Sequence, residues 1–199
     1  MKLFRYDIRE LEPSVYKKWY ACMAKEKQER IDRFLLEDDK KRSVAGEMLA
    51  RWAISERCNI PAESIVFKKT ENGKPYVKEL PVEFNISHSG DLVVCAVDDQ
   101  PVGIDIERIR PLDLKLAKRI CTEEELLYLF GHRPTAGDFA FTTDREVLVR
   151  FFEIWTAKEA NCKLRGLDIS ALFAEADPMP VKTDYTFDGD YVICVVTYR

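Results

Sequence analysis

The sequence predicts an α+β protein built from two similar halves, with a cleft between them. Helical and strand patterns alternate along both halves, and 199 residues suit one large domain or two small ones. Residues 90–97 also resemble residues 189–196, with five of eight positions identical. This internal repeat indicates a duplicated unit, and clefts between such units favour ligand sites. The alternative is that two strands after Gly-Asp turns simply look alike.

The first half begins with a strand over 3–8, followed by three predicted helices at about 14–24, 25–37 and 38–58. Ile31, Phe34 and Leu35 are expected on the buried side of the second helix. Gly46 in the third helix is expected to permit close packing, since glycine costs roughly 1 kcal/mol there relative to alanine. The apolar face of that helix comprises Val44, Met48, Leu49, Trp52 and Ala53. A turn at 71–75 lies among further strands, which are predicted at 65–67, 76–78, 83–86 and 92–98.

The second half opens with a strand over 102–107, and a helix is expected to begin within 113–119. Thr122 and Glu125 have the spacing of a capping box at the start of another helix. Residues 131–144 are predicted to form a loop and residues 145–164 a long helix. The remaining strands are expected at 172–173, 183–187 and 191–197.

Composition narrows the class of protein. The net charge is −4, which argues against nucleic acid as the partner. No apolar run approaches the ~18 residues of a membrane span, and the first residues lack the apolar core of a signal peptide. The six cysteines form no C-x-x-C pair, so we expect a reduced, cytoplasmic protein without structural zinc.

Two carboxylates lie two residues apart in the strand over 102–107. Residues i and i+2 of a strand share a face, so Asp105 and Glu107 point one way while Ile104 and Ile106 point into the core. Two oxygen donors about 7 Å apart at their Cα atoms can converge on one cation, and Mg²⁺ or Mn²⁺ suits them better than Zn²⁺. The alternative is an edge strand with a solvated acidic face.

Three other stretches carry polar groups that suit phosphate chemistry. Residues 85–90, Asn-Ile-Ser-His-Ser-Gly, offer hydrogen-bond donors to phosphate oxygens, or they form an ordinary polar turn. Glu159 and Lys163 share a helix face at the edge of an apolar stripe, or they form a solvated surface pair. Arg42 follows two lysines in a helix and could bind phosphate, or the three residues form a solvated basic face.

These motifs occur in a specific order: F-N-I-S-H-S, then G-I-D-I-E, then W-T-A-K-E-A-N-C-K. In that order the chain resembles the Sfp-type 4′-phosphopantetheinyl transferases, from the basic helix near Arg42 to the last strand. Such enzymes move phosphopantetheine from coenzyme A to a serine of an apo acyl or peptidyl carrier protein. The resemblance implies a pseudo-twofold fold with coenzyme A between the halves. One departure is the absence of a second glycine shortly after Gly166, which affects the expected local loop geometry.

The resemblance also implies roles for individual residues. The metal ligands for Mg²⁺, or for Mn²⁺ in its place, would be Asp105, Glu107 and Glu159. The catalytic groups would be Glu159 as base, Lys163 at the leaving phosphate and His88 at the pyrophosphate. Contacts to coenzyme A would come from Arg42, Lys74, Ser87, His88, Lys158 and Lys163, with Lys27 and Arg30 placed there by spacing alone. The helix and loop over 122–144 would receive the carrier protein.

The same resemblance implies two subdomains and a single-chain site. Residues 1–101 would contact the nucleotide of coenzyme A, and residues 102–199 would carry the metal and catalytic groups. Because a duplicated chain supplies its own twofold cleft, we expect a monomer. Two alternatives remain: a non-catalytic module that binds carrier protein or coenzyme A, and a Mg²⁺-dependent phosphohydrolase that uses the same carboxylates.

Overall fold

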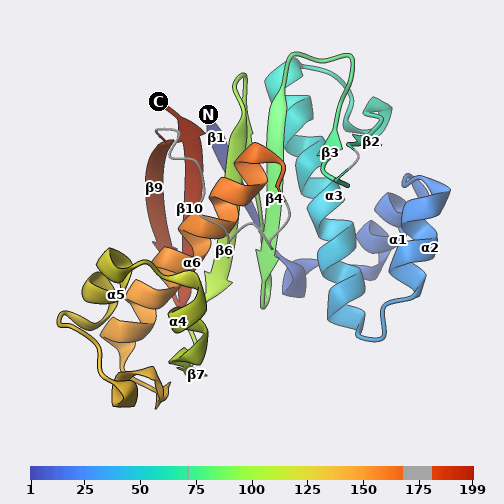
Figure 1. Ribbon diagram of the computed structural model, residues 1–199. Coiled ribbons are helices and arrows are strands. Elements are labelled where there is room, and N and C mark those ends of the chain that lie inside the picture. Colours follow the sequence, from blue (N-terminus) through green and yellow to red (C-terminus); the bar gives the residue numbers. More distant parts are fainter. Residues whose placement is uncertain (71, 168–180) are drawn as a thin grey trace.

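Two three-stranded antiparallel sheets form the frame of the molecule (Figure 1). The structure is a computed structural model, and it describes residues 1–70, 72–167 and 181–199. The strand orders are β1-β5-β4 and β6-β10-β9, so each half places its last strand between its first and its penultimate one. The strands are β1 (Lys2–Asp7), β4 (Glu83–Ser89), β5 (Leu92–Asp98), β6 (Val102–Arg108), β9 (Val181–Asp188) and β10 (Tyr191–Tyr198). The predicted duplicated α+β fold is confirmed.

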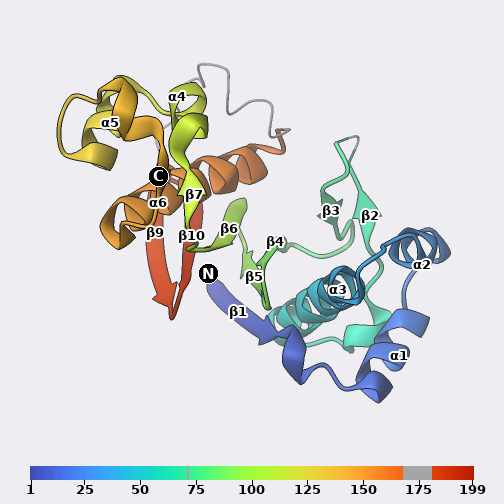
Figure 2. The ribbon, with the colours of Figure 1, turned by 90° about the horizontal axis from the view of Figure 1, so that it is seen from below.

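Each sheet is covered by one long helix. Helix α3 packs on the first sheet and α6 on the second, and the two lobes meet along β4, β5 and β6 (Figure 2). The helices are α1 (Pro13–Ala21), α2 (Lys25–Asp32), α3 (Glu37–Cys58), α4 (Ala117–Ile120), α5 (Glu123–Phe130) and α6 (Arg145–Arg165). Short elements are β2 (Lys68–Lys69), β3 (Pro75–Tyr76), β7 (Leu112–Asp113), β8 (Phe141–Thr142) and the 3-10 turns Ile8–Glu10, Ala62–Ser64, Leu114–Leu116 and Ala136–Phe139.

The internal repeat corresponds to the two final hairpins. Gly90 and Gly189 occupy the turns with φ of +54° and +58°, a region that glycine enters without strain. In the first half the Ile8 amide donates to the Asp91 carbonyl at 2.9 Å. In the second half the Ile109 amide donates to the Asp190 carbonyl at 2.7 Å. The same bond at the same place in each half relates the two units residue by residue.

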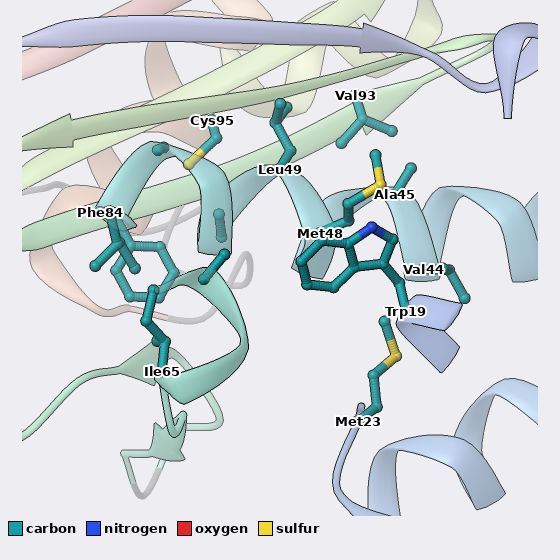
Figure 3. Packing of buried hydrophobic residues seen from close by; sticks show 14 of the residues in the cluster. Trp19, Met23, Val44, Ala45, Met48, Leu49, Ile65, Phe84, Val93 and Cys95 are labelled. Atoms are coloured by element: carbon teal, nitrogen blue, oxygen red, sulfur yellow. The ribbon is translucent and has the colours of Figure 1, made fainter. Parts of the chain in front are cut away.

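The core of the first half lies between α3 and its sheet. Val44, Met48 and Leu49 are buried there with Trp19 and Phe84 (Figure 3). A Cβ atom at Gly46 would lie 3.4 Å from the Ile86 side chain, at the edge of ordinary van der Waals contact, so packing against β4 does not require the glycine that the sequence was expected to need there.

Two apolar side chains are less buried than the sequence predicts. Leu35 is 96% exposed because α2 ends at Asp32 and the chain turns before α3. Trp52 is 39% exposed and packs edge-on against Tyr6 at the rim of the sheet. Ile31, at the centre of the same predicted face as Leu35, is fully buried.

Several predicted elements differ from the structure. Residues 65–67 are extended but form no strand, since no neighbouring strand pairs with them in the described residues; Ile65 is nevertheless buried and Val66 exposed, as alternation requires. The predicted loop over 131–144 contains the short strand β8, which pairs with β7. Strand β7 itself comes just before the helical turns that were expected within 113–119. The capping box of Thr122 and Glu125 is confirmed. The strand predicted at 172–173 lies outside the described residues.

Cys95 and Cys194 are buried, as expected of cysteines that act as small apolar side chains, whereas Cys22 is exposed. Within the described ranges, no helix has both the length and the hydropathy needed to cross a membrane.

Candidate active site at the seam between the halves

The two halves are joined by polar side chains that run along β4 and β6. Successive outward residues of β4 each bond to β6: Asn85 Oδ1 accepts from the Ile104 amide at 3.2 Å, and Ser87 Oγ donates to Asp105 at 2.7 Å. Ser89 Oγ donates to Glu107 at 2.8 Å and accepts from the Arg108 amide at 3.1 Å. Alternation along a strand explains this spacing. The polar turn expected over 85–90 is therefore mostly a strand, in which Ser87 and Ser89 point at the acidic strand.

Asp105 and Lys163 form the centre of this seam. Lys163 Nζ lies 2.6 Å from Asp105 Oδ1, 2.9 Å from Ser87 Oγ and 3.8 Å from Glu159 Oε2. Asp105 is 3% exposed, and its second oxygen is buried without a hydrogen-bond partner among the described residues. A buried carboxylate oxygen without a partner is costly, which makes this atom a candidate ligand for a cation or a substrate proton.

The other two carboxylates experience the same environment. Burial raises the pKa of Glu107, an effect that the hydrogen bond from Ser89 opposes. Burial and the neighbouring charge of Asp105 raise the pKa of Glu159 to about 7. A cation placed among the three carboxylates would lower these pKa values, because it stabilises the charged forms.

Gly103 explains why α6 can reach the seam. A Cβ atom at this position would lie 1.9 Å from the Ala160 carbonyl oxygen and 2.7 Å from the Leu164 amide nitrogen. Real Cβ atoms do not approach backbone so closely, so only glycine lets β6 and α6 pack backbone to backbone here. That contact places Glu159 and Lys163 over Asp105.

A cavity of about 800 Å³ opens next to the seam, on the side of the first half. Four of the predicted ligands of coenzyme A line it: Lys27, Arg30, Arg42 and His88. Lys27 and Arg30 form no ion pair in the described part of the chain, and burial lowers the pKa of Lys27. An anion in the cavity would therefore give both cations a partner, and it would offset the desolvation of Lys27.

His88 and Arg42 lie at the mouth of this cavity. His88 is exposed to solvent, but desolvation by nearby protein atoms, with the charges of Arg42 and Lys163, lowers the pKa of the imidazole. Arg42 is already engaged, since its guanidinium donates to the Gly90 carbonyl at 2.7 Å and pairs with Asp39. Arg42 therefore supports the hairpin turn as well as the cavity wall.

The other four predicted ligands, Lys74, Lys158, Ser87 and Lys163, lie apart from the cavity lining. Lys74 donates to the Lys163 carbonyl at 3.1 Å, so it reaches across the seam to α6. Lys158 of α6 pairs with Glu125 of α5 at 2.9 Å, a contact that joins these two helices. The structure brings Ser87 and Lys163 together, as expected, but gives Lys158 a partner that the sequence did not indicate.

The three carboxylates have the oxygen donors that a divalent cation requires, but they are not gathered closely around one point. Across the described ranges, no group of three His, Cys, Asp or Glu side chains is gathered closely enough to hold a metal ion. Asp105, Glu107 and Glu159 nevertheless offer only oxygen donors, which suit Mg²⁺, and the buried Asp105 Oδ2 lacks a partner. The residues therefore fit a hard cation, which would compete with Lys163 for Asp105.

Sequence reasoning missed Asn85, Ser89 and the role of Gly103. All three lie inside the quoted motifs, but their functions depend on the pairing of β4 with β6 and of β6 with α6. Alternation alone placed Asn85 and Ser89 on the same face as Ser87, and that signal was available from the sequence.

Comparison with known proteins identifies the family. A family model described as 4′-phosphopantetheinyl transferase, N-terminal, matches residues 11–100, and one described as the 4′-phosphopantetheinyl transferase superfamily matches residues 101–189. The 4′-phosphopantetheinyl transferase psf-1 of Bacillus pumilus is 39% identical over 175 residues, which cover 85% of this chain and 71% of that protein.

Two other relatives give the same result. The 4′-phosphopantetheinyl transferase gsp of Aneurinibacillus migulanus is 38% identical over 164 residues, or 82% of this chain and 65% of that protein. The 4′-phosphopantetheinyl transferase Sfp of Bacillus subtilis (strain 168) is 36% identical over 172 residues, or 85% and 72%.

The chain has a duplicated α+β frame with carboxylates and a lysine at its seam, and it matches transferases over most of its length. Together these observations indicate a group-transferring enzyme. The chain belongs to the 4′-phosphopantetheinyl transferase family, as its motifs predicted.

Proposed function

We propose that this chain transfers the 4′-phosphopantetheine group of coenzyme A to a serine of an apo acyl or peptidyl carrier protein, releasing 3′,5′-ADP. The observation that carries this proposal is the contact of Lys163 with Asp105 and Ser87, next to Glu107 and Glu159, beside a cavity whose lining includes Lys27, Arg30 and Arg42. A pyrophosphate at this point would meet cations from both halves.

The cavity suits the nucleotide end of coenzyme A. Its volume of about 800 Å³ falls in the range of small-molecule sites. Its lining combines apolar residues, among them Ile65, Phe67 and Phe84, with Lys27 and Arg30, which provide charge for phosphate groups. In this assignment residues 1–101 bind the nucleotide and residues 102–199 carry the catalytic groups, with the boundary between β5 and β6.

The transfer breaks one phosphorus–oxygen bond and makes another. The carrier serine oxygen bonds to the phosphorus that bears pantetheine, and the bridging oxygen leaves with 3′,5′-ADP. Glu159 accepts the serine proton, because its carboxylate lies beside Lys163 at the seam. Lys163 neutralises the leaving phosphate, and His88 and Ser87 orient the pyrophosphate.

Mg²⁺, or Mn²⁺ in its place, would be held by Asp105, Glu107 and Glu159. When bound, the ion supplies charge neutralisation on the pyrophosphate oxygens. The buried, unpartnered Asp105 Oδ2 supports this assignment. Ser89 would then fix the orientation of Glu107 through the hydrogen bond that the two side chains share.

The carrier protein would dock on α5 and the segment that follows it. Leu127, Tyr128 and Phe141 are 44%, 52% and 65% exposed in this region. Apolar groups of this size at a surface favour protein contacts. Because β4 and β6 of the same chain complete the seam, we propose a monomer as the working unit.

The intact mass of an apo carrier protein, incubated with this protein, coenzyme A and Mg²⁺, tests the reaction. We expect a gain equal to one phosphopantetheine, and we expect EDTA to prevent it. A series of acyl, aryl and peptidyl carrier proteins is needed, because partner choice is open. No gain with any carrier, while coenzyme A still binds, would reduce the chain to a binding module. Release of 3′,5′-ADP without a carrier would indicate a hydrolase.

A further inference from the structure

The hairpin of β2 and β3 contacts the catalytic helix of the other half. At its tip, Asn72 Nδ2 donates to the Gly166 carbonyl at 2.8 Å and Lys74 Nζ donates to the Lys163 carbonyl at 3.1 Å. We call these two hydrogen bonds the clasp. At the turn end of β2, the hairpin is tied to α2 by the ion pair of Lys69 with Glu26. The hairpin thus joins α2 to the end of α6, and Figure 2 shows its tip directed toward that end.

The clasp adds donors to two carbonyls at the end of α6, those of Lys163 and of the capping residue Gly166. The last four carbonyls of an α-helix have no intrahelical partner. At the end of α6, Gly166 turns into the left-handed region with φ of +66°, and its amide and that of Leu167 close back onto Cys162 and Lys163. The carbonyls of Lys163 and Gly166 then receive donors from the other half. A positive charge at this end also complements the helix dipole.

The same hairpin forms part of the nucleotide cavity. Gly73 and Pro75, on either side of Lys74 in the chain, line the cavity together with Lys68 and Lys69. Lys163, whose carbonyl the clasp holds, extends its side chain to Asp105 and Ser87 at the seam. One short segment therefore contacts both the cavity and the backbone of the seam lysine.

We propose that the clasp is a positioning device: it fixes the last turn of α6, and hence Lys163, and it tightens when coenzyme A fills the cavity. Asn72 is the positioning residue in this arrangement, and it does not touch the reacting atoms. The proposal rests on the proposed function, since it assumes that the cavity holds the nucleotide and that Lys163 acts in transfer.

Asn72 separates this role from substrate binding more cleanly than Lys74 does. Lys74 is expected to contact coenzyme A, so its replacement would change affinity and positioning together. The Asn72 side chain is exposed and bonds to α6. Asn72→Ala removes the amide donor, whereas Asn72→Gln keeps it on a longer arm. Lys78→Ala is the control, because Lys78 is exposed just beyond β3 and forms no ion pair in the described part of the chain.

Hydrogen exchange in the peptide that covers 160–167 tests the clasp without any catalysis. In the wild-type protein we expect coenzyme A to slow exchange in this peptide. In Asn72→Ala we expect faster exchange without coenzyme A and less slowing with it, while Lys78→Ala behaves as wild type. If exchange is the same in Asn72→Ala and Lys78→Ala, the clasp is overturned.

Kinetics tests the consequence for transfer. We expect Asn72→Ala to lower kcat about five- to tenfold, the effect of one lost hydrogen bond, with the Kd of coenzyme A changed less than twofold. Asn72→Gln should recover part of the loss. A higher Kd at unchanged kcat would make Asn72 a binding residue and overturn the positioning role. If the wild-type protein transfers nothing, the proposed function fails, whereas the exchange comparison still decides whether the clasp orders α6.

Discussion

The two halves of the molecule share a backbone plan but not a chemistry. Equivalent hydrogen bonds at Ile8 and Ile109 relate β1 to β6, so Phe4 corresponds to Asp105 and Tyr6 to Glu107. The left-handed residues that end α3 and α6, Asn59 and Gly166, relate those helices in the same way. By that relation Trp52 corresponds to Glu159 and Glu56 to Lys163.

In the first half, Tyr6 and Trp52 pack against each other, and Glu56 forms an ion pair at the surface. Tyr6 and Trp52 contact edge to face with ring centroids 6.3 Å apart, where the second half has two carboxylates. Glu56 pairs with Lys2 at 2.6 Å, and both side chains are about half exposed. Lys163 forms its 2.6 Å pair with an Asp105 side chain that is only 4% exposed. The two ion pairs have the same length but contribute differently to the free energy of folding, because that contribution depends on burial.

The largest effect is expected from Asp105→Asn, which replaces the carboxylate at the seam with a neutral side chain. The corresponding position of the first half, Phe4, is also neutral. Transfer should fall about a thousandfold, because the site loses a central charge that would face the metal and Lys163. The midpoint of thermal unfolding should fall, since the substitution removes the charge that pairs with Lys163 in a buried contact. Mass-detected transfer and thermal scans check both expectations. Near-normal transfer at millimolar Mg²⁺ would exclude the metal role.

Gly103→Ala should break the second half by separating β6 from α6. A Cβ atom 1.9 Å from the Ala160 carbonyl forces a backbone shift, for which we expect a loss of about 1–3 kcal/mol in the free energy of unfolding. Urea denaturation measures this loss, and transfer by the remaining folded protein should fall as well.

The control for this substitution is Gly137→Ala. A Cβ atom there would have its nearest neighbour at 3.8 Å, so stability should hardly change. Lys2 stands at the position of Gly103 in the first half, and Lys2→Ala should cost no more than about 1 kcal/mol, the upper range for an exposed pair. If Gly103→Ala is as mild as these controls, the close approach of β6 and α6 does not determine the site.

Much of this comparison was predictable, because it depends on local patterns. Alternation in 102–107 placed Asp105 and Glu107 opposite Ile104 and Ile106, and the repeat at 90–97 indicated the duplication. The boundaries of α3 and α6 followed from their caps and apolar spacing within one or two residues.

The remainder depends on contacts between distant segments. Residues 65–67 have the alternation of a strand, but a strand requires a partner that only the fold provides. Lys158 lies one position from Glu159, yet the position of α5 gives it to Glu125. No local pattern encodes the distance between β6 and α6 at Gly103, so the reason for that glycine emerges only from packing.

Lys163→Ala should slow transfer more than it weakens binding, by about a hundredfold in kcat. The lysine contacts Asp105 and Ser87 at the seam and does not line the cavity, so the Kd of coenzyme A should change less. Glu56→Ala, at the corresponding position of the first half, is the matched control and should leave transfer unchanged. A pure binding defect in Lys163→Ala would move Lys163 from the reaction to substrate binding.

The smallest effect concerns the cations of the cavity. Lys27→Ala should raise the KM for coenzyme A about tenfold and the KM for dephospho-coenzyme A much less, if Lys27 reads the 3′-phosphate. Arg42→Ala should show the same preference, but with a loss of stability, because Arg42 also holds the Gly90 carbonyl. Lys27 is the cleaner probe, since it forms no ion pair in the described part of the chain. Equal changes in KM for both substrates would place the 3′-phosphate elsewhere, and the cations of the first half would then serve the pyrophosphate alone.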